Sequence, residues 1–298
     1  MSVAKKIIND FIDDDRELNK LELSKLTKEE LIDKYMDVNN NKNLQENLLL
    51  NVSHDLRSPL NVILSILQFY ESGYITGSDN MSKYMTSIKR NSYRMLKLID
   101  NLIDTTRLDK NYYKIERRNL DIVKLIENTI SSIDKYAKQK NISLIFDTNV
   151  EKCIMAIDPE AIDRIIMNLL SNAIKFSYNN GNVYINLWKR NNQLNISVKD
   201  EGMGIPLKEQ KKIFNRFMQS SNHKKIEQSG SGIGLALVES LTKAHNGKIL
   251  LNSEEDRGSE FIIKLPIIKL SENNEDNHII NAKTNIEMLE IEFSDIYL

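Results

Sequence analysis

The stretch Asp158–Ser177, DPEAIDRIIMNLLSNAIKFS, carries the main signals for the fold. It opens with an acid and a proline, which is typical of a helix start. The acid can cap the first turn, and proline lacks only an amide that this turn leaves unpaired. Apolar side chains then recur at helical spacing: Ile165, Ile166, Leu169, Leu170 and Ala173. The pattern predicts a helix that buries most of its surface.

Three polar side chains align on one face of this helix, at i, i+4 and i+7: Asn168, Asn172 and Lys175. Amide oxygens are hard ligands and a lysine supplies positive charge, so this stripe suits a hydrated Mg²⁺ beside phosphate oxygens. The alternative is the ordinary polar face of an amphipathic helix. The stripe alone does not decide between the two.

Alternating helix and strand patterns surround this helix over residues 115–268. A helical pattern, DIVKLIENTISSIDKYAKQKN, and a strand pattern, ISLIFDTN, come before it. Two alternating strands, VYINLWKR and LNISVKD, come after it, and two more lie around the turn in KILLNSEEDRGSEFIIKLP. This order predicts one α/β sandwich domain.

Two glycine-rich segments interrupt the domain. In VKDEGMGIP, Asp200 directly follows a strand and can accept a hydrogen bond from an exocyclic amine, while the glycines let the backbone approach a ligand. These glycines are Gly202 and Gly204. In SGSGIGLALVESL, the glycines precede a helix whose N-terminus can cradle phosphates. Each signal is weak alone, because such segments also form ordinary turns.

The polar stretch between the two glycine segments, residues 207–229, has the composition of a mobile lid. Its apolar part, IFNRFM, offers a clasp made of Phe214 and Phe217.

Upstream of the α/β region, two stretches carry heptad patterns. The first seam is Leu49, Val52, Leu56, Pro59, Ile63, Ile66 and Tyr70. The second is Met81, Ile88, Met95 and Leu102, with Tyr84, Leu98 and Ile99 beside it. The turn ESGYITGSDN joins them, so the pattern predicts a helical hairpin. Because a lone hairpin encloses no core, we expect a homodimer in which two hairpins form a four-helix bundle.

The segment NVSHDLRSPLNVIL, residues 51–64, places His54 at heptad position f, opposite the seam and facing solvent. A surface histidine is usually inert, but these neighbours favour chemistry. Asp55 can hold one ring nitrogen protonated, which leaves the other lone pair available to attack a phosphoryl group. Ser58 shares the helix face of His54. Pro59 cannot donate to the carbonyl of Asp55 and therefore loosens the helix one turn beyond the histidine.

The composition is that of a globular protein, with 298 residues, 41% apolar and 28% charged, which allows about two domains. The net charge of −1 argues against general attraction to nucleic acid or anionic membranes. The single cysteine, Cys153, excludes internal disulfides, fits a reducing compartment and is interpreted as a small buried residue. No run is long and apolar enough for a membrane span and the start lacks a signal peptide, so we expect a cytoplasmic chain.

The two ends of the chain give weaker signals. Residues 1–47 are highly charged, with a helical pattern in TKEELIDKYM and an asparagine-rich break at NNNKN. They are interpreted as a solvated lead-in or as a helix coupled to the one that carries His54. Beyond the polar linker SENNEDN, the tail TNIEMLEIEFSDIYL alternates nearly regularly and is either a lone strand or a docking peptide. The spacing of the other histidines fits no zinc site: His223, His245 and His278.

In their order, these motifs resemble the catalytic core of two-component sensor histidine kinases. SHDLRSPLN resembles the phosphoacceptor box of that family and MNLLSNAIKFS its asparagine box. DEGMGIP and GSGIGLAL resemble its two glycine boxes, IFNRFMQ its phenylalanine box, and RGSEFIIKLP its closing strand pair. The resemblance covers residues 45–268. One box is modest support, whereas all of them in the family's order and spacing are specific.

The resemblance implies an α+β fold: a helical hairpin that forms a dimeric four-helix bundle, followed by an α/β sandwich that binds ATP. His54 would be phosphorylated from ATP with Asp55 polarising the ring, and the phosphoryl group would pass to an aspartate of a response regulator receiver domain. The expected regions are a lead-in at 1–44, the phosphotransfer hairpin at 45–112, the ATP-binding domain at 113–268, and a linker and tail at 269–298.

Within the ATP-binding domain, the resemblance implies that Asn172 is the Mg²⁺ ligand, with Asn168 and Lys175 near the phosphates. Phe176 would lie by the nucleotide and Asp200 would read the adenine amine. The adenine pocket would be shaped by Gly202 and Gly204, with Phe214 and Phe217 from the phenylalanine box. The phosphate-facing end of the lid would be Gly230, Ser231, Gly232 and Gly234.

Two positions depart from the family pattern. Ser58 stands where threonine or asparagine is more frequent, at a position that helps to place a water for dephosphorylating the regulator, so the sequence leaves phosphatase activity open. Ile233 stands where threonine is common, and an apolar residue there is a tolerated variant.

Two other classes of function compete with a kinase. A clamp ATPase of the gyrase or Hsp90 type needs a catalytic acid on the asparagine-box helix, where this chain has amides. A scaffold protein with a decayed kinase site would have lost polar residues from a box, and none is lost. The kinase is therefore the favoured prediction.

Overall fold

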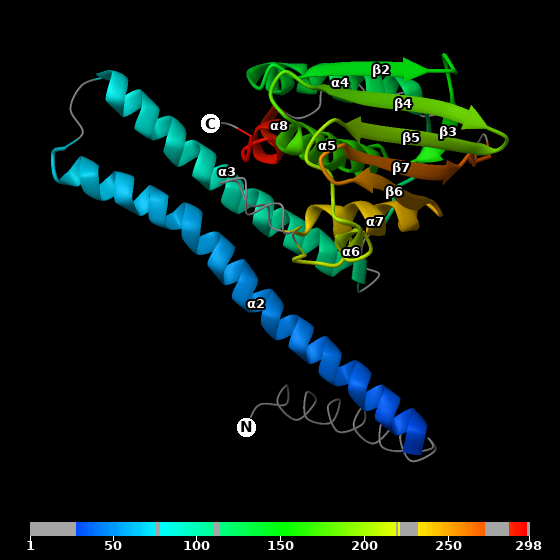
Figure 1. Cartoon of the computed structure of the whole chain (residues 1–298), viewed down its shortest axis with the longest axis horizontal. Helices are drawn as coiled ribbons and strands as arrows, with labels where there is room; N and C mark the ends of the chain where they lie inside the picture. Colours follow the sequence, from blue (N-terminus) through cyan, green and yellow to red (C-terminus); the bar gives the residue numbers. More distant parts are fainter. Residues whose placement is uncertain are drawn as a thin grey trace, which may run out of the picture. The chain divides into compact units, whose positions relative to one another are not determined.

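The computed structural model describes residues 28–74, 78–109, 114–218, 220, 232–271 and 286–296. The chain divides into two compact units, Met1–Ser53 and His54–Leu298. Two long helices, α2 (Lys28–Glu71) and α3 (Ser78–Asp109), are joined by a short turn (Figure 1). At the end of α2 the Gly73 amide donates to the Tyr70 carbonyl at 3.0 Å. The predicted helical hairpin is confirmed.

The predicted seam of α2 is buried more deeply than most of its other apolar positions. Pro59 is buried, Ile66 is 8% exposed, and Leu56 and Ile63 are half-buried. Tyr70, at the end of the seam, is exposed. Apolar side chains outside the seam also remain exposed: Leu60, Val62, Leu64 and Leu67. Three of them, Leu60, Leu64 and Leu67, stand at i, i+4 and i+7 and form a second apolar stripe that the heptad pattern did not identify.

The predicted asparagine-rich break is wrong, because α2 runs without interruption through residues 39–43. Asparagine costs a helix only about 0.7 kcal/mol relative to alanine, so a few of them weaken a long helix without ending it. Among the described residues, no helix has the length and apolar character required to cross a membrane.

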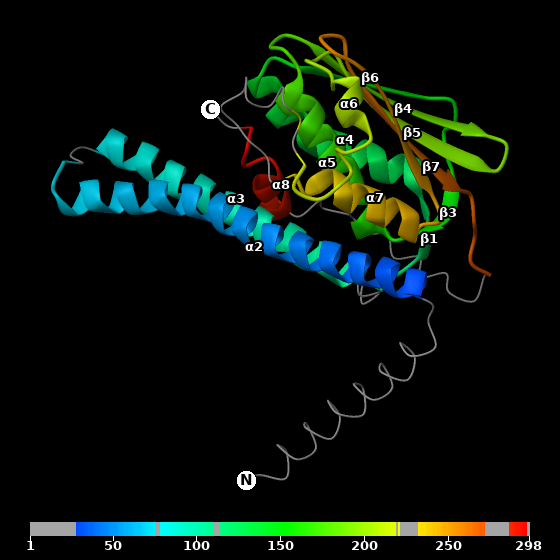
Figure 2. The ribbon, with the colours of Figure 1, turned by 60° about the horizontal axis from the view of Figure 1, so that its bottom comes forward.

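The α/β region forms two layers, with a five-stranded sheet packed against α4, α5 and α7 (Figure 2). The strand order is β2-β4-β5-β7-β6, in which β2 and β4 are parallel and the other neighbours antiparallel. The elements are α4 (Ile122–Gln139), β2 (Ser143–Thr148), α5 (Pro159–Phe176), β4 (Asn182–Arg190), β5 (Gln193–Asp200), α6 (Leu207–Gln210), α7 (Gly234–Ala244), β6 (Lys248–Glu254) and β7 (Gly258–Pro266). The predicted sandwich is confirmed.

Local sequence explains why these elements form. In β4, Val183, Ile185 and Leu187 are fully buried and alternate with half-buried residues, because successive side chains of a strand point to opposite faces. Helix α5 begins as predicted, since the Asp158 side chain accepts a hydrogen bond from the Ala161 amide at 3.1 Å.

A second, two-stranded sheet was not predicted. Its strands, β1 (Arg118–Asp121) and β3 (Ile154–Ile157), pair in an antiparallel manner. Each has four residues, which is too short for alternation to be distinguished from a loop.

The C-terminal segment, residues 286–296, comprises α8 (Ile286–Glu292) and the turns that follow it. The strand interpretation is therefore wrong. The docking interpretation holds, because three side chains at helical spacing join the core of the α/β domain: Leu289, Phe293 and Ile296. The Phe293 ring stacks on that of Tyr136 in α4, with centroids 4.7 Å apart.

Candidate functional site

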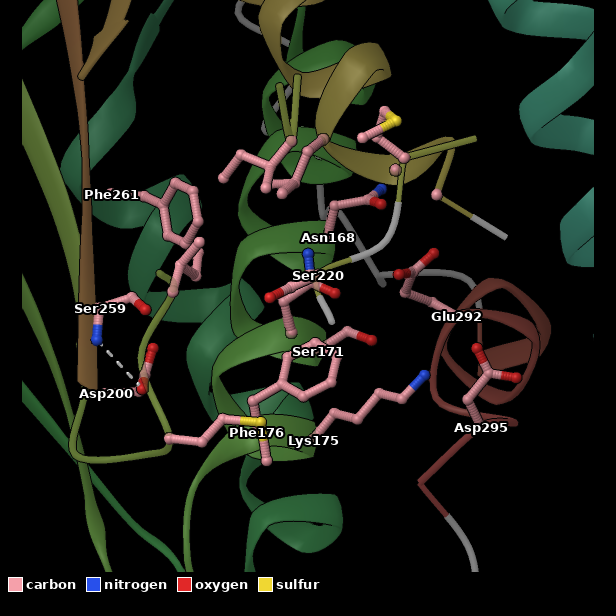
Figure 3. Close-up of a pocket in the computed structure, with 18 of the residues that line it drawn as sticks. Asn168, Ser171, Lys175, Phe176, Asp200, Ser220, Ser259, Phe261, Glu292 and Asp295 are labelled. Atoms are coloured by element: carbon pink, nitrogen blue, oxygen red, sulfur yellow. Dashed lines mark hydrogen bonds between the residues drawn. The ribbon is translucent and has the colours of Figure 1, made fainter. Parts of the chain in front are cut away.

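A pocket lies beside α5, at the edge where the two glycine segments meet the sheet (Figure 3). Helix α5 contributes Asn168, Ser171, Asn172, Lys175 and Phe176. The end of β5 contributes Asp200, and the segment after it contributes Met203, Gly204 and Ile205. Gly232 lies just before α7, whose first turn contributes Gly234 and Leu235. Ser259 and Phe261 of β7 line it as well. Most of the predicted nucleotide-binding residues therefore lie in one pocket.

Five predicted residues lie next to the pocket or outside the described chain. The amide of Gly202 donates to Asp200, directly behind the pocket wall. The ring of Phe214 meets that of the pocket residue Phe261 edge to face, and the Phe217 amide donates to the Gly232 carbonyl at 2.9 Å. Gly230 and Ser231 fall outside the described residues, as do residues 219 and 221–229 of the predicted lid.

Asp200 is held in a fixed orientation. Its Oδ1 accepts hydrogen bonds from the amides of Gly202 at 2.9 Å and Ser259 at 3.3 Å. Burial raises the pKa of Asp200 to about 6, although these two backbone bonds act in the opposite direction. Because both bonds end on Oδ1, the second oxygen, Oδ2, can accept from an amine in the pocket.

The first glycine segment needs its glycines because it packs directly against other backbone. A side chain at Gly202 would collide with the Phe176 carbonyl at the end of α5. Gly204 has a φ of 63°, and a side chain there would collide with the backbone of Glu254. Glycine alone combines this conformation with such a close approach.

The polar stripe of α5 faces the pocket. Lys175 is only 4% exposed, and its ammonium lies 5.4 Å from the centre of the Phe176 ring. Burial lowers the pKa of Lys175 to about 8, against the attraction of Asp295. Asn168 donates through Nδ2 to the Arg164 carbonyl at 3.0 Å, so its Oδ1 stands at the start of α7, where a side chain on Gly234 would meet it.

Lys140 fixes the end of α5 that carries this stripe. Its ammonium donates to the carbonyls of Ile174 at 3.0 Å and Lys175 at 2.9 Å, which the last turn of a helix leaves without intrahelical partners. Burial lowers the pKa of Lys140. No local sequence pattern indicates this contact, because Lys140 follows a different helix, α4.

Four pocket residues come from outside the predicted nucleotide-binding region. Lys97 and Asn101 of α3 line the pocket, as do Glu292 and Asp295 of the C-terminal segment. Sequence patterns could not find them, because nothing local to either segment indicates which distant surface it contacts.

His54 is on the surface of α2, with 82% of its side chain exposed. Its Nδ1 lies 3.3 Å from Oδ1 of Asp55, as the proposed polarising pair requires. Ser58 is exposed one turn further along the helix. The predicted outward position of the histidine is thus observed, while its role stays a prediction.

Two residues interpreted as structural are buried. Cys153 is 5% exposed, and burial raises the pKa of its thiol. His245 is also 5% exposed, and its Nε2 accepts from the Asp158 amide at 3.1 Å while Nδ1 bonds the Leu241 carbonyl at 2.9 Å. Burial lowers the pKa of His245, and an Nε2 that accepts a hydrogen bond belongs to the neutral ring.

The fold and pocket define a class of ATP-binding domain. Residues 157–269 match the histidine kinase-, DNA gyrase B- and HSP90-like ATPases. Residues 44–111 match the His Kinase A (phospho-acceptor) domain, and together the two matches cover more than half of the chain. The chain belongs to the sensor histidine kinases, of which it carries the catalytic core.

Individual relatives agree with this assignment. The chain is 30% identical to histidine kinase P4 of Formosa agariphila over 220 aligned residues. These residues cover 73% of this chain and 16% of that protein. It is 30% identical over 218 residues to the sensor histidine kinase WalK of Bacillus subtilis, covering 72% of this chain and 36% of WalK. The chain therefore spans well under half the length of these curated relatives.

Solved structures share the fold. Histidine kinase ThkA, in complex with the response regulator protein TrrA, has a TM-score of 0.59 at 19% identity, over 81% of this chain and 67% of that one. Full-length ShkA in complex with AMPPNP has a TM-score of 0.57 at 23% identity, over 76% of this chain and 46% of that one.

Proposed function

We propose that this chain transfers the γ-phosphoryl group of ATP to His54 and then to an aspartate of a response regulator receiver domain. The observation that carries the proposal is the combination of two features in one chain. One is an exposed His54–Asp55 pair on a hairpin helix, and the other is a pocket whose α5 wall presents two amides and a buried lysine. The relatives are histidine kinases, and ThkA is seen with a response regulator.

The residues that line the pocket support ATP as its ligand. Oδ2 of Asp200 would accept from the adenine amine, and Phe176 would lie beside the nucleotide. The phosphates would then reach Asn168, Asn172 and Lys175, with the backbone of Gly232 and Gly234 at the start of α7. The structure of ShkA with AMPPNP supports a nucleotide ligand for this fold.

The α5 side of the pocket also suits a bound Mg²⁺. The amide oxygen of Asn172 is a hard ligand that leaves most coordination positions to water and phosphate oxygens, as this ion prefers. When bound, the ion would neutralise phosphate charge. Asn172 would hold it, while Lys175 contributes a separate positive charge.

The chemistry would start at His54. Asp55 accepts from Nδ1–H and so keeps the lone pair on Nε2, which attacks the γ-phosphorus. The new N–P bond forms as the P–O bond to ADP breaks, and ADP leaves with the electron pair. In the second step, an aspartate oxygen of the regulator attacks the same phosphorus and the N–P bond breaks. Most of the rate acceleration would come from positioning the reacting groups and neutralising the phosphate charge.

We also propose that the chain forms a homodimer through its helical hairpin. The hairpin leaves apolar stripes exposed on both helices of the described region: Leu60, Leu64 and Leu67 on α2, and Leu96, Ile99 and Ile103 on α3. A four-helix bundle of two hairpins would cover them. We retain 45–112 for this hairpin and 113–268 for the ATP-binding domain as proposed boundaries. A monomer in light scattering at micromolar concentration would contradict the dimer.

The clamp ATPase is less well supported. The acids of α5, Glu160 and Asp163, lie in its first two turns, away from the pocket-lining positions. Asp163 accepts from the Thr129 hydroxyl of α4 at 2.5 Å. Neither acid is placed to activate a water beside the phosphates.

The test is incubation with γ-labelled ATP and Mg²⁺, followed by an acid challenge. Label on histidine is acid-labile, so wild-type label should be lost in acid and absent from His54→Ala. Asn172→Ala should abolish labelling and leave the dimer intact. Ser58→Ala is the matched control on the same helix face, since it should keep the label and reveal any phosphatase step as slower dephosphorylation of the regulator. Acid-stable label, or label in His54→Ala, would refute the proposal.

A further inference from the structure

The C-terminal segment, residues 286–296, contacts two parts of the molecule at once. Its apolar side chains enter the core of the ATP-binding domain, where Phe293 is fully buried and stacks on Tyr136. Its acidic side chains pair with α3: Glu290 with Lys89 at 2.8 Å, and Asp295 with Arg94 at 3.4 Å. The segment therefore ties the hairpin helix to the nucleotide-binding domain.

Lys97 of α3 is at the centre of this contact. Its ammonium donates to the Glu292 carbonyl at 2.6 Å, and it pairs with the carboxylates of Glu292 at 3.3 Å and Asp295 at 3.2 Å. Only 14% of the Lys97 side chain is exposed. The carboxylates are 11% and 19% exposed, so these charges interact in a region with little solvent screening.

The same two carboxylates line the pocket (Figure 3). They come from the side that faces the Lys175 ammonium, which points toward them across the pocket. Lys175 belongs to the α5 stripe at which the phosphates of ATP are expected. The segment thus places two carboxylates where the negatively charged triphosphate would bind.

We propose that residues 286–296 act as a built-in inhibitor of nucleotide binding, because the carboxylates of Glu292 and Asp295 occupy the phosphate side of the pocket. This inference rests on the proposed binding of ATP there. The triphosphate and the carboxylates compete for the same cations, Lys97 and Lys175, and repel each other where solvent screening is weak. Releasing or neutralising the segment opens the pocket to ATP, and whatever displaces it switches the kinase on.

The test measures the affinities of MgATP and adenosine for the full chain by calorimetry. In the isosteric variant Glu292→Gln/Asp295→Asn, the dissociation constant for MgATP should fall about tenfold, because like charges at short range are removed. The constant for adenosine, which has no phosphates, should change less than about twofold. Glu290→Gln is the matched control, since it removes an ion pair with α3 from the same helix but does not line the pocket.

The single variant Glu292→Gln keeps the Asp295–Lys97 pair and should increase the affinity for MgATP by a smaller factor. It provides the test if the double variant does not fold. Unchanged or weaker MgATP binding in these variants would overturn the proposal that residues 286–296 inhibit binding, and it would leave the kinase proposal intact. An equal gain for adenosine would also overturn it, because the effect would then not depend on phosphate charge. No nucleotide binding in any form would overturn both proposals.

Discussion

Nucleotide affinity should fall below a pH of about 6, with Asp200 as the cause. Burial raises the pKa of this carboxyl to about 6 in the free protein. In the proposed binding mode, Oδ2 accepts a hydrogen bond from the adenine amine above that pH. Below it, the protonated carboxyl would present a donor to the amine donor. Because the ligand binds the ionised form, affinity should drop about tenfold for each pH unit below the pKa. Between pH 7 and pH 5 the loss is thus about tenfold, or ~1.4 kcal/mol.

Adenosine is the suitable ligand, because it has no phosphate that titrates in this range. Calorimetry at pH 5, 6, 7 and 8 gives the profile. Asp200→Asn retains the acceptor that bonds Gly202 and Ser259 but can present an amide donor to the adenine amine. It should weaken binding at pH 7 by about 10- to 100-fold and remove the step near pH 6.

Asp163→Asn is the matched control. Burial also raises the pKa of Asp163 to about 6, but its carboxyl bonds Thr129 in the contact of α5 with α4. This variant should therefore keep the pH step. A flat wild-type profile between pH 5 and 7, or a step that survives in Asp200→Asn, would refute the assigned role of Asp200.

Two contacts that only the structure revealed have measurable consequences for stability. Phe293→Ala should release the C-terminal segment, since truncating a fully buried phenylalanine costs about 3–5 kcal/mol, so residues 286–296 should become sensitive to proteolysis. Met288→Ala, on the exposed side of α8, should leave the cleavage rate unchanged. Lys140→Met should lower the free energy of unfolding in urea by about 1–3 kcal/mol, because the last carbonyls of α5 lose their donor. Lys138→Met, which removes an exposed pair with Asp134, should change it by less than about 0.5 kcal/mol.

The parts of the fold that sequence predicts well are those with long, strong local signals. The start of α5 follows from Asp158 and Pro159, whose effects on the first turn are local. The strands β4 and β5 follow from eight or nine residues of alternation. The stripe on α5 follows from helical geometry alone, which is why its members reach the pocket together.

The parts that sequence misses depend on contacts between distant segments. Nothing around Lys97 indicates that it meets Glu292, which lies far along the chain. The short strands β1 and β3 exist because they pair with each other. In α8, alternate acids gave the appearance of a strand, but burial of Leu289 and Phe293 against the domain core selects a helix. Tertiary packing here overrides a weak local pattern.

The ring of His245 has a mechanical consequence. It fastens the last residues of α7 to the start of α5 through the Asp158 amide, and Arg117 adds a hydrogen bond to the Ala244 carbonyl at 2.9 Å. The far end of α7 is thus anchored, whereas its first residue, Gly234, borders the pocket. Because His245 and the buried core residues Leu237 and Leu241 hold the rest of α7, we expect any adjustment to a bound nucleotide to be concentrated at its glycine end.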